Sequence, residues 1–148
     1  MVSRFFQQAI SSDTYTELPE DWLLDPIFAP VQKRLKIKIQ GTRSSQYLDG
    51  KYEGKTGRVM GAQRAANVDQ TAMVEFDDGE ARSVLAKYIV PVYPEKRGDI
   101  ALVLHGRYKG RTVKVAEVEG QTCTCMSLDT SSWADHQQDM MCVLTSED

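Results

Sequence analysis

Apolar and polar residues alternate along most of the chain from residue 34 onward. In LKIKI, Leu35, Ile37 and Ile39 alternate with two lysines, which predicts a half-buried strand with a basic outer face. TGRVMG predicts a second strand, and TAMVEFDDGEARSVL predicts a hairpin that turns at DDG. AKYIVPV predicts a closing strand near Pro91. Four or five short strands in about 60 residues suit a small barrel with a small core.

The second half of the chain repeats this order in compressed form. IALVLHG corresponds to LKIKIQG, TCTCMSLDT corresponds to TAMVEFDDG, and MMCVLT predicts a closing strand. Aligning the two hairpins predicts that Thr124, Met126 and Leu128 point into the core. Cys123 and Cys125 would then point away from it, either covered by the other domain or exposed as thiols. PVYPEKRGD is a short junction bounded by prolines, and it predicts two barrels that lie close together.

One phrase occurs twice, as KYEGKTGRV over residues 51–59 and as RYKGRTVKV over residues 107–115. Gly54 and Gly110 stand where a strand must turn tightly, which favours a residue that tolerates positive φ. The flanking bases would project from the turn, and Tyr52 and Tyr108 would stack on a ligand or pack against the core. Basic side chains beside an aromatic ring suit a nucleic-acid surface.

The first 32 residues have a different pattern. Val2, Phe5, Phe6, Ala9 and Ile10 fall on one helical stripe and predict a short amphipathic helix. The stretch LPEDWLLDPIFAP is apolar and interrupted by prolines. Two interpretations stay open: a linker that packs along the first domain to cover its own apolar side chains, or a docking segment for another subunit.

Composition narrows the class of protein. The chain has 148 residues, 41% hydrophobic and 26% charged, and no apolar run approaches the ~20 residues that span a bilayer. Three cysteines without framework spacing indicate a reducing compartment. The net charge of −3 hides alternating blocks, because residues 33–64 hold nine basic and two acidic side chains and residues 96–114 hold six and one. Each basic block contains one copy of the repeated phrase.

The first copy, GKYEGKTGRVMG over residues 50–61, resembles the KOW motif. The second copy, HGRYKGRTVKV, departs from that motif: Val113 stands where the pattern has its second glycine, matched by Gly57 in the first copy. The resemblance implies SH3-like (Tudor-like) β-barrels, as in NusG-type transcription elongation factors and some ribosomal proteins.

Over residues 20–145 the arrangement is similar to the C-terminal KOW pair of the eukaryotic NusG-type elongation factors, the DSIF large-subunit family. The shared features are Asp21-Trp22, a basic strand, YLDGKYEGKTGRV, an acidic hairpin, VPV and a divergent second unit. The NGN domain and the repetitive C-terminal tracts of the full factor have no counterpart, which leaves an excised piece and a stand-alone relative as alternatives. The resemblance implies contact with RNA polymerase, with emerging RNA, or with both.

The sequence thus predicts an all-β fold of two tandem small SH3-like (Tudor/KOW) barrels at 33–93 and 96–146, after a lead segment at 1–32. The predicted function is non-catalytic, nuclear binding of RNA or DNA, of RNA polymerase II, or of elongation-complex proteins. Net acidity keeps a pure protein-interaction module as an alternative. The predicted nucleic-acid contacts are Lys36, Lys38, Arg43, Lys51, Tyr52, Lys55, Arg58, Arg107, Tyr108, Lys109, Arg111 and Lys114.

Zinc binding and catalysis fit the sequence less well than non-catalytic binding does. We expect no cofactor, metal, membrane contact or small-molecule substrate. The C-x-C spacing of Cys123 and Cys125, considered with His136 and Cys142, does not match structural zinc sites. Asp135-His136 has no partner geometry for a triad, and neither a P-loop nor a dinucleotide fingerprint occurs. A Tudor-like cage for methylated Lys or Arg remains an alternative. Its candidate rings are Tyr47, Tyr52, Phe76, Tyr88, Tyr93, Tyr108 and Trp133.

Overall fold

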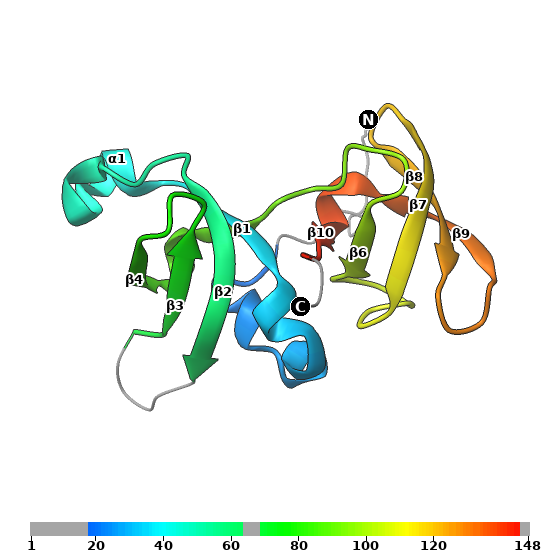
Figure 1. Cartoon of the computed structure of the whole chain (residues 1–148), viewed down its shortest axis with the longest axis horizontal. Helices are drawn as coiled ribbons and strands as arrows, with labels where there is room; N and C mark the ends of the chain where they lie inside the picture. Colours follow the sequence, from blue (N-terminus) through cyan, green and yellow to red (C-terminus); the bar gives the residue numbers. More distant parts are fainter. Residues whose placement is uncertain (1–17, 64–68, 146–148) are drawn as a thin grey trace, which may run out of the picture.

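The computed structural model describes residues 18–63 and 69–145, and it divides into two antiparallel five-stranded sheets (Figure 1). The all-β prediction is confirmed at this level. The helix expected over residues 2–10 lies outside the described residues. No helix in the described part is long and apolar enough to span a membrane.

The first sheet contains β1 (Lys36–Ile39), β2 (Thr56–Gln63), β3 (Thr71–Phe76), β4 (Ala81–Leu85) and β5 (Ile89–Pro91). The second contains β6 (Ile100–Val103), β7 (Thr112–Glu119), β8 (Thr122–Ser127), β9 (Trp133–Gln137) and β10 (Met141–Val143). The short helices are η2 (Trp22–Leu24), η3 (Pro26–Arg34), α1 (Thr42–Ser45), η4 (Tyr47–Gly50), η5 (Ala86–Tyr88) and η6 (Gln138–Met140).

The two sheets have the same topology. Their orders are β4-β3-β2-β1-β5 and β10-β6-β7-β8-β9, so the first strand of each unit lies between the second and the last. The long second strand shifts register at the same point in both units, between Val59 and Gly61 and between Val115 and Glu117. No pairing among the described residues joins the two edge strands of either sheet, so neither sheet is closed. The sequence repeat therefore corresponds to a structural repeat.

The first core follows the predicted alternation. Ile37 and Ile39 of β1 are buried, and so are Val74 and Phe76 of β3. Burying one face of a two-residue period against the facing strands is what drives these segments to pair. The strands predicted from LKIKI, TGRVMG, AKYIVPV and MMCVLT are all present. β9 is not among the predicted strands, because SSWADHQQ has no apolar alternation.

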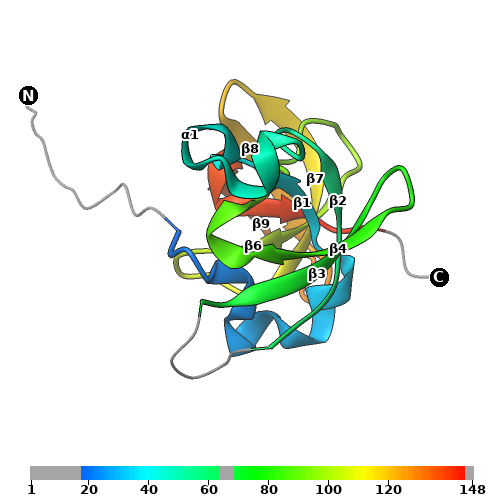
Figure 2. The same ribbon diagram turned by 90° about the vertical axis from the view of Figure 1, so that its left-hand side faces the viewer.

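The lead segment completes the first core. Trp22, Leu23 and Phe28 are at most 4% exposed and belong to the same hydrophobic cluster as the inner side chains of β1–β3. The indole Nε1–H of Trp22 donates to the Ile89 carbonyl at 2.9 Å, so its polar atom is satisfied inside the core. Both η3 and α1 flank the first sheet, at opposite ends in the two perpendicular views (Figures 1 and 2).

The two units are joined by backbone hydrogen bonds as well as by the junction. Leu35 and Leu144 form an antiparallel bridge, and the Thr145 amide donates to the Arg34 carbonyl at 2.7 Å. The Val143 amide donates to the Val92 carbonyl at 2.9 Å. Leu102, Leu104, Cys142 and Leu144 of the second unit pack in the core cluster of the first. The C-terminal strand therefore holds the second unit against β1.

The predicted orientation of β8 is wrong. Cys123 and Cys125 are 0% and 1% exposed and point into the second core, whereas Leu128 is 47% exposed and Thr124 and Met126 are half-buried. The pairing of Val115 on β7 with Cys125 on β8 sets this register. Cysteine and threonine alternate here with similar polarity, so a shift of one residue reverses every side chain without any signal in the sequence.

Candidate functional site

The repeated phrase forms the same turn in both units. The Gly54 amide donates to the Ile39 carbonyl and the Gly110 amide donates to the Val103 carbonyl, each at 2.8 Å. The two glycines have φ of +79° and +91°, which confirms the prediction of positive φ at these positions. Each turn closes the connection between the first and second strands of its unit.

Glu53 stabilises the longer first connection. Its carboxylate accepts hydrogen bonds from the Gly41 amide at 3.2 Å, the Thr42 amide at 2.7 Å and the Thr42 hydroxyl at 2.6 Å. These are the first residues of the α1 turn, where backbone amides lack helical partners. The hydrogen bond from the Thr42 side chain, followed by that from its amide, lowers the pKa of Glu53. Glu53 therefore fixes the position of the loop that carries α1.

Lys109 occupies the place of Glu53 in the second turn and has different partners. Its Nζ lies 2.6 Å from the Asp25 carboxylate and 5.7 Å from the centre of the Phe28 ring. A Cβ at Gly110 would lie 3.0 Å from Ile27, so the lead segment packs closely on this turn. The second turn thus binds the lead segment where the first binds its own loop.

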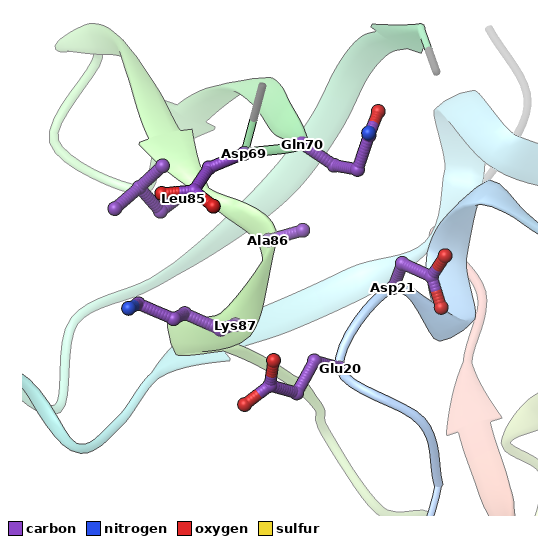
Figure 3. A pocket seen from close by; sticks show the side chains of 7 residues that line it. All are labelled: Glu20, Asp21, Asp69, Gln70, Leu85, Ala86 and Lys87. Atoms are coloured by element: carbon purple, nitrogen blue, oxygen red, sulfur yellow. The ribbon is translucent and has the colours of Figure 1, made fainter. Parts of the chain in front are cut away.

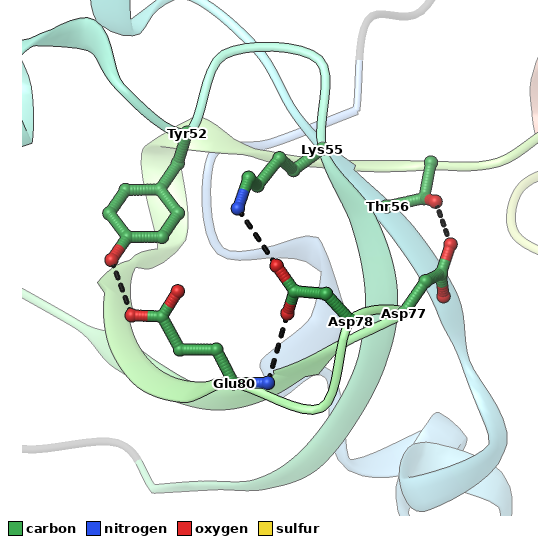
Figure 4. Close-up of polar contacts among 6 residues, drawn as sticks. All are labelled: Tyr52, Lys55, Thr56, Asp77, Asp78 and Glu80. Carbon is green, nitrogen blue, oxygen red and sulfur yellow. Dashed lines mark hydrogen bonds and ion pairs between the residues drawn. The ribbon is translucent and has the colours of Figure 1, made fainter.

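The ring of Tyr52 is enclosed. Tyr52 is 2% exposed and stacks on Phe76 with 5.2 Å between ring centroids. Its hydroxyl donates to the Glu80 carboxylate at 2.6 Å, and this hydrogen bond raises the pKa of Tyr52 (Figure 4). Three cations lie 5.2–5.6 Å from the ring centroid: Lys51, Lys55 and Arg82. Tyr52 is therefore a packing residue beneath the turn, and its ring is already in contact with Phe76 and with cations of the same chain.

Acidic residues of the β3–β4 hairpin pair with two of the predicted cations. Lys55 Nζ lies 3.0 Å from the Asp78 carboxylate, and Arg58 lies 3.0 Å from Glu75 (Figure 4 shows the Lys55 pair). The hydrogen bond with Asp78 raises the pKa of Lys55. A phosphate at either cation would have to compete with a carboxylate of the same chain.

A strip of bases crosses the outer face of β1, beside the paired hairpin. Lys36 lies opposite Arg58 in the β1–β2 register, and Lys38, two residues along β1, faces the same side. The last turn of η3 adds Lys33 and Arg34, and the Arg58 guanidinium donates to the Lys33 carbonyl at 3.4 Å. We refer to Lys33, Arg34, Lys36, Lys38 and Arg58 as the basic strip.

The second turn carries a different group of cations. The guanidinium carbons of Arg107 and Arg111 lie 5.4 Å and 5.0 Å from the centre of the Tyr108 ring. His136 of β9 meets the same ring edge-on, with 5.6 Å between centroids, and burial lowers the pKa of His136. Unlike Tyr52, Tyr108 is only half-buried. Lys114 is exposed on β7, outside this cluster.

The predicted residues do not form one surface. Arg43 and Lys51 are exposed at the end of the first sheet that carries α1, whereas the β6–β7 turn belongs to the second unit and packs on the lead segment (Figure 1). The structure therefore brings together Lys36, Lys38 and Arg58, and separately Arg107, Tyr108 and Arg111.

An open hollow of about 350 Å³ lies between the lead segment, η5 and the start of β3. Its charged lining residues are Glu20, Asp21, Asp69 and Lys87, and Figure 3 shows the three carboxylates pointing in different directions. A surface with this excess of acids repels phosphates. Within residues 18–63 and 69–145, no three histidine, cysteine or acidic side chains group as metal ligands.

The aromatic residues form separate contacts. Tyr47 stacks on Tyr88 with 4.6 Å between centroids, and the hydroxyl of Tyr47 accepts a hydrogen bond from the Leu85 amide. Tyr93 and Trp133 are exposed, at 43% and 61%. A cage for a methylated cation needs several rings around one open centre. At Tyr52, internal cations already occupy the neighbourhood of the ring.

All three cysteines are buried free thiols. Burial raises the pKa of Cys125 and of Cys142 to about 12, and the Cys142 thiol donates to the Lys36 carbonyl at 3.2 Å. Thiols of this kind pack as small apolar groups and have little thiolate at neutral pH.

No protein-family model matches the chain, and a search of the curated proteins finds no match.

Sequence reasoning missed several residues that shape these surfaces. Lys33 and Arg34 belong to the basic strip, and their place in QKRLKIK next to the basic strand was a usable signal. Arg82 and Glu80 reach Tyr52 only through the pairing of β3 with β4. No local pattern indicated that contact.

Proposed function

We propose that this chain is a non-catalytic binding module of the transcription elongation machinery, built from two SH3-like units of the KOW/Tudor type. It binds RNA or DNA phosphates through the basic strip, in the nucleus, beside RNA polymerase. The first unit carries this contact.

Two features support the assignment to SH3-like units. The same strand order occurs in both sheets, and the KOW-like phrase forms the same glycine turn at the same place in each. This agreement between a sequence repeat and a structural repeat is what the resemblance to KOW pairs implies.

The observation that carries the nucleic-acid proposal is the register of Lys36 with Arg58, with Lys38 alongside. Lys36 and Arg58 of the strip line one hollow together with two acids of β3 and its turn, Glu75 and Asp77. The exposed lysines Lys33 and Lys38 add positive charge on either side of Lys36. Phosphates bind such a face through Coulomb attraction and counterion release.

The test compares two double variants of equal charge change. Lys36→Glu with Lys38→Glu should weaken binding of a single-stranded RNA oligonucleotide about tenfold or more, measured by fluorescence anisotropy at two salt concentrations. Lys87→Glu with Lys96→Glu alters two exposed lysines outside the strip and should have a much smaller effect. Equal effects of the two variants, or an affinity independent of salt, would refute the proposal.

A second candidate function is protein docking. Trp133 and Leu128 are 61% and 47% exposed near the tip of the β8–β9 hairpin, and exposed aromatic and aliphatic groups of this kind anchor protein interfaces. If this function holds, Trp133→Ser with Leu128→Ser should reduce capture of purified RNA polymerase II by the full chain. RNA binding should remain unchanged in the same variant.

A further inference from the structure

β9 is an edge strand, as β4 is in the first sheet, and it lies on the side of the second unit away from the first sheet (Figure 1). An edge strand presents a row of backbone amides and carbonyls with which another strand can pair. The amide of Gln138, directly after β9, donates to the Gln121 carbonyl at 2.8 Å. Because bonding alternates along an antiparallel pair, the backbone groups of Trp133, Asp135 and Gln137 point away from β8.

The first unit covers part of the corresponding edge with its own loop. Leu85 of β4 points its amide outward, and the Tyr47 hydroxyl, from the loop between β1 and β2, accepts a hydrogen bond from it at 3.0 Å. The described connection between β6 and β7 is shorter and contains no helix. Among the described residues, nothing accepts a hydrogen bond from the outward amides of Trp133, Asp135 and Gln137. The edge of the second unit is therefore open.

The side chains beside this edge are aromatic and acidic. Trp133 is 61% exposed. Asp135, also exposed, lies in register with Thr124 of β8, and Thr124 with Glu117 of β7, so the three side chains form one row on the outer face of the sheet. Residues 115–148 contain seven acidic side chains and no Lys or Arg. The outer face next to the edge is therefore negatively charged.

We propose that the outer edge of β9 binds an extended segment of a partner protein, which adds to the sheet as a sixth strand and carries a Lys or Arg opposite Asp135. The backbone of this segment pairs with the outward amides and carbonyls of β9. Its cation contacts the Asp135 carboxylate and the indole ring of Trp133. The inference deepens the second candidate function, protein docking, and rests on it; the basic strip takes no part.

Charge selects this occupant over two others. Full antiparallel pairing of β9 with a second copy would set the two Asp135 carboxylates opposite each other, which is unfavourable. A nucleic acid has no row of amides to pair with the edge, and Asp135 and Glu117 repel its phosphates. Lys114, the base of β7 on this face, is two strands away from the edge. A basic extended peptide satisfies both the backbone and the carboxylates.

The test uses the full chain, labelled with ¹⁵N, and the peptide acetyl-Thr-Val-Arg-Val-Thr-amide. In antiparallel pairing its arginine lies opposite Asp135, and its valines lie opposite the half-buried Ala134 and His136. The peptide should shift the amide signals of Trp133, Asp135 and Gln137 and slow their exchange with solvent. The same peptide with glutamate in place of arginine should bind about fivefold more weakly, because an attraction becomes a repulsion.

Two N-methylated forms of the arginine peptide separate backbone pairing from charge. A methyl group on the arginine backbone nitrogen removes the amide that donates to the Asp135 carbonyl, and it should weaken binding about tenfold. A methyl group on the nitrogen of the second valine points away from β9 and should have little effect.

Gln137→Pro makes the matched change in the chain. Gln137 has a φ of −70°, which proline adopts, and its amide takes no part in the pairing with β8. The variant should therefore melt close to Gln137→Ala, but it should bind the arginine peptide about tenfold more weakly. Gln137→Ala, which keeps the amide, should bind like the wild type. Asp135→Asn should weaken binding about threefold.

The inference is overturned if the arginine peptide leaves the three outward amides unshifted, if the glutamate peptide binds equally well, or if Gln137→Pro binds as Gln137→Ala does. A concentration-dependent shift of these amides without peptide would assign the edge to a second copy, and a shift caused by a single-stranded RNA oligonucleotide would assign it to nucleic acid. Either result would also overturn it. Failure to capture purified RNA polymerase II, with peptide binding intact, would reject the docking function alone.

Discussion

Lys109 and Asp25 form an ion pair of 2.6 Å that joins the second turn to the lead segment. The corresponding residue of the first turn, Glu53, has the opposite charge and binds backbone amides of its own loop. The same turn thus anchors two different segments, and the charge at this one position decides which.

The first prediction concerns the coupling energy of this pair. The side chains are 39% and 31% exposed, so a double-mutant cycle with Asp25→Ala and Lys109→Ala should give about 0.5 kcal/mol. The measurement is urea denaturation of the four proteins. A coupling near zero would show that the two charges act independently.

Gly57 should tolerate no side chain. A Cβ there would lie 2.4 Å from the Glu75 carbonyl oxygen and 2.9 Å from the Phe76 Cα, and both are backbone atoms. We expect Gly57→Ala to lower the free energy of unfolding by about 1–3 kcal/mol. Gly61→Ala is the matched control in the same strand, because no atom lies within 4 Å of its Cβ position. Similar losses for both variants would contradict this account.

Glu53 should contribute stability that depends on pH. Its pKa is lowered in the folded chain from an ordinary value of 4.5. The contribution is therefore present above that value and is lost as the pH falls through the folded pKa. Glu53→Gln should melt below the wild type at pH 7, and the difference should disappear in acid. A difference that stayed constant with pH would exclude this role of the charge.

The two tryptophans should report different environments. Trp22 is 4% exposed and Trp133 is 61% exposed. Trp133→Phe, which leaves only Trp22, should emit at shorter wavelength and resist quenching by acrylamide. Trp22→Phe should show red-shifted emission and strong quenching. Strong quenching of Trp22 in the first variant would mean that the lead segment is not docked in solution.

The thiols should be unreactive in the native chain. Because burial raises the pKa of Cys125 and Cys142 to about 12, and also raises that of Cys123, almost no thiolate is present at pH 8. A disulfide reagent should label all three only after guanidinium is added, as followed by mass spectrometry. Rapid native labelling of Cys123 or Cys125 would support the outward orientation that the structure contradicts.

Much of the first unit could be predicted from its sequence, because local patterns and core packing agree there. Ile37 and Ile39 alternate with lysines, and Val74 and Phe76 alternate with polar residues, so burial of one face leaves a single acceptable register. The second unit was harder to predict. β8 alternates cysteine with threonine, and its neighbour β9 has no apolar face. Only the pairing of β8 with β7 therefore sets the orientation of Cys125.

The candidate binding surfaces were also predictable only in part. The phrase around Gly54 and Gly110 identified both turns, because a tight turn with positive φ has a local sequence requirement. Which cations are paired with acids did not follow from the phrase. Asp78 and Glu75 reach Lys55 and Arg58 across a sheet, from about twenty residues away.

The sequence alone determined the strands of the first unit, the repeat and its two glycine turns, since each depends on the conformational preferences of neighbouring residues. The tertiary structure alone decided the docking of the lead segment, the pairing of the cations and the packing beside Tyr108. These depend on contacts between residues that are distant in the chain. Ser127 stands at the position that corresponds to Phe76, which in the sequence looks like a loss of core volume. Only the packing shows that Val113, opposite Ser127, and the neighbouring Tyr108 leave a space of no more than about 10 Å³.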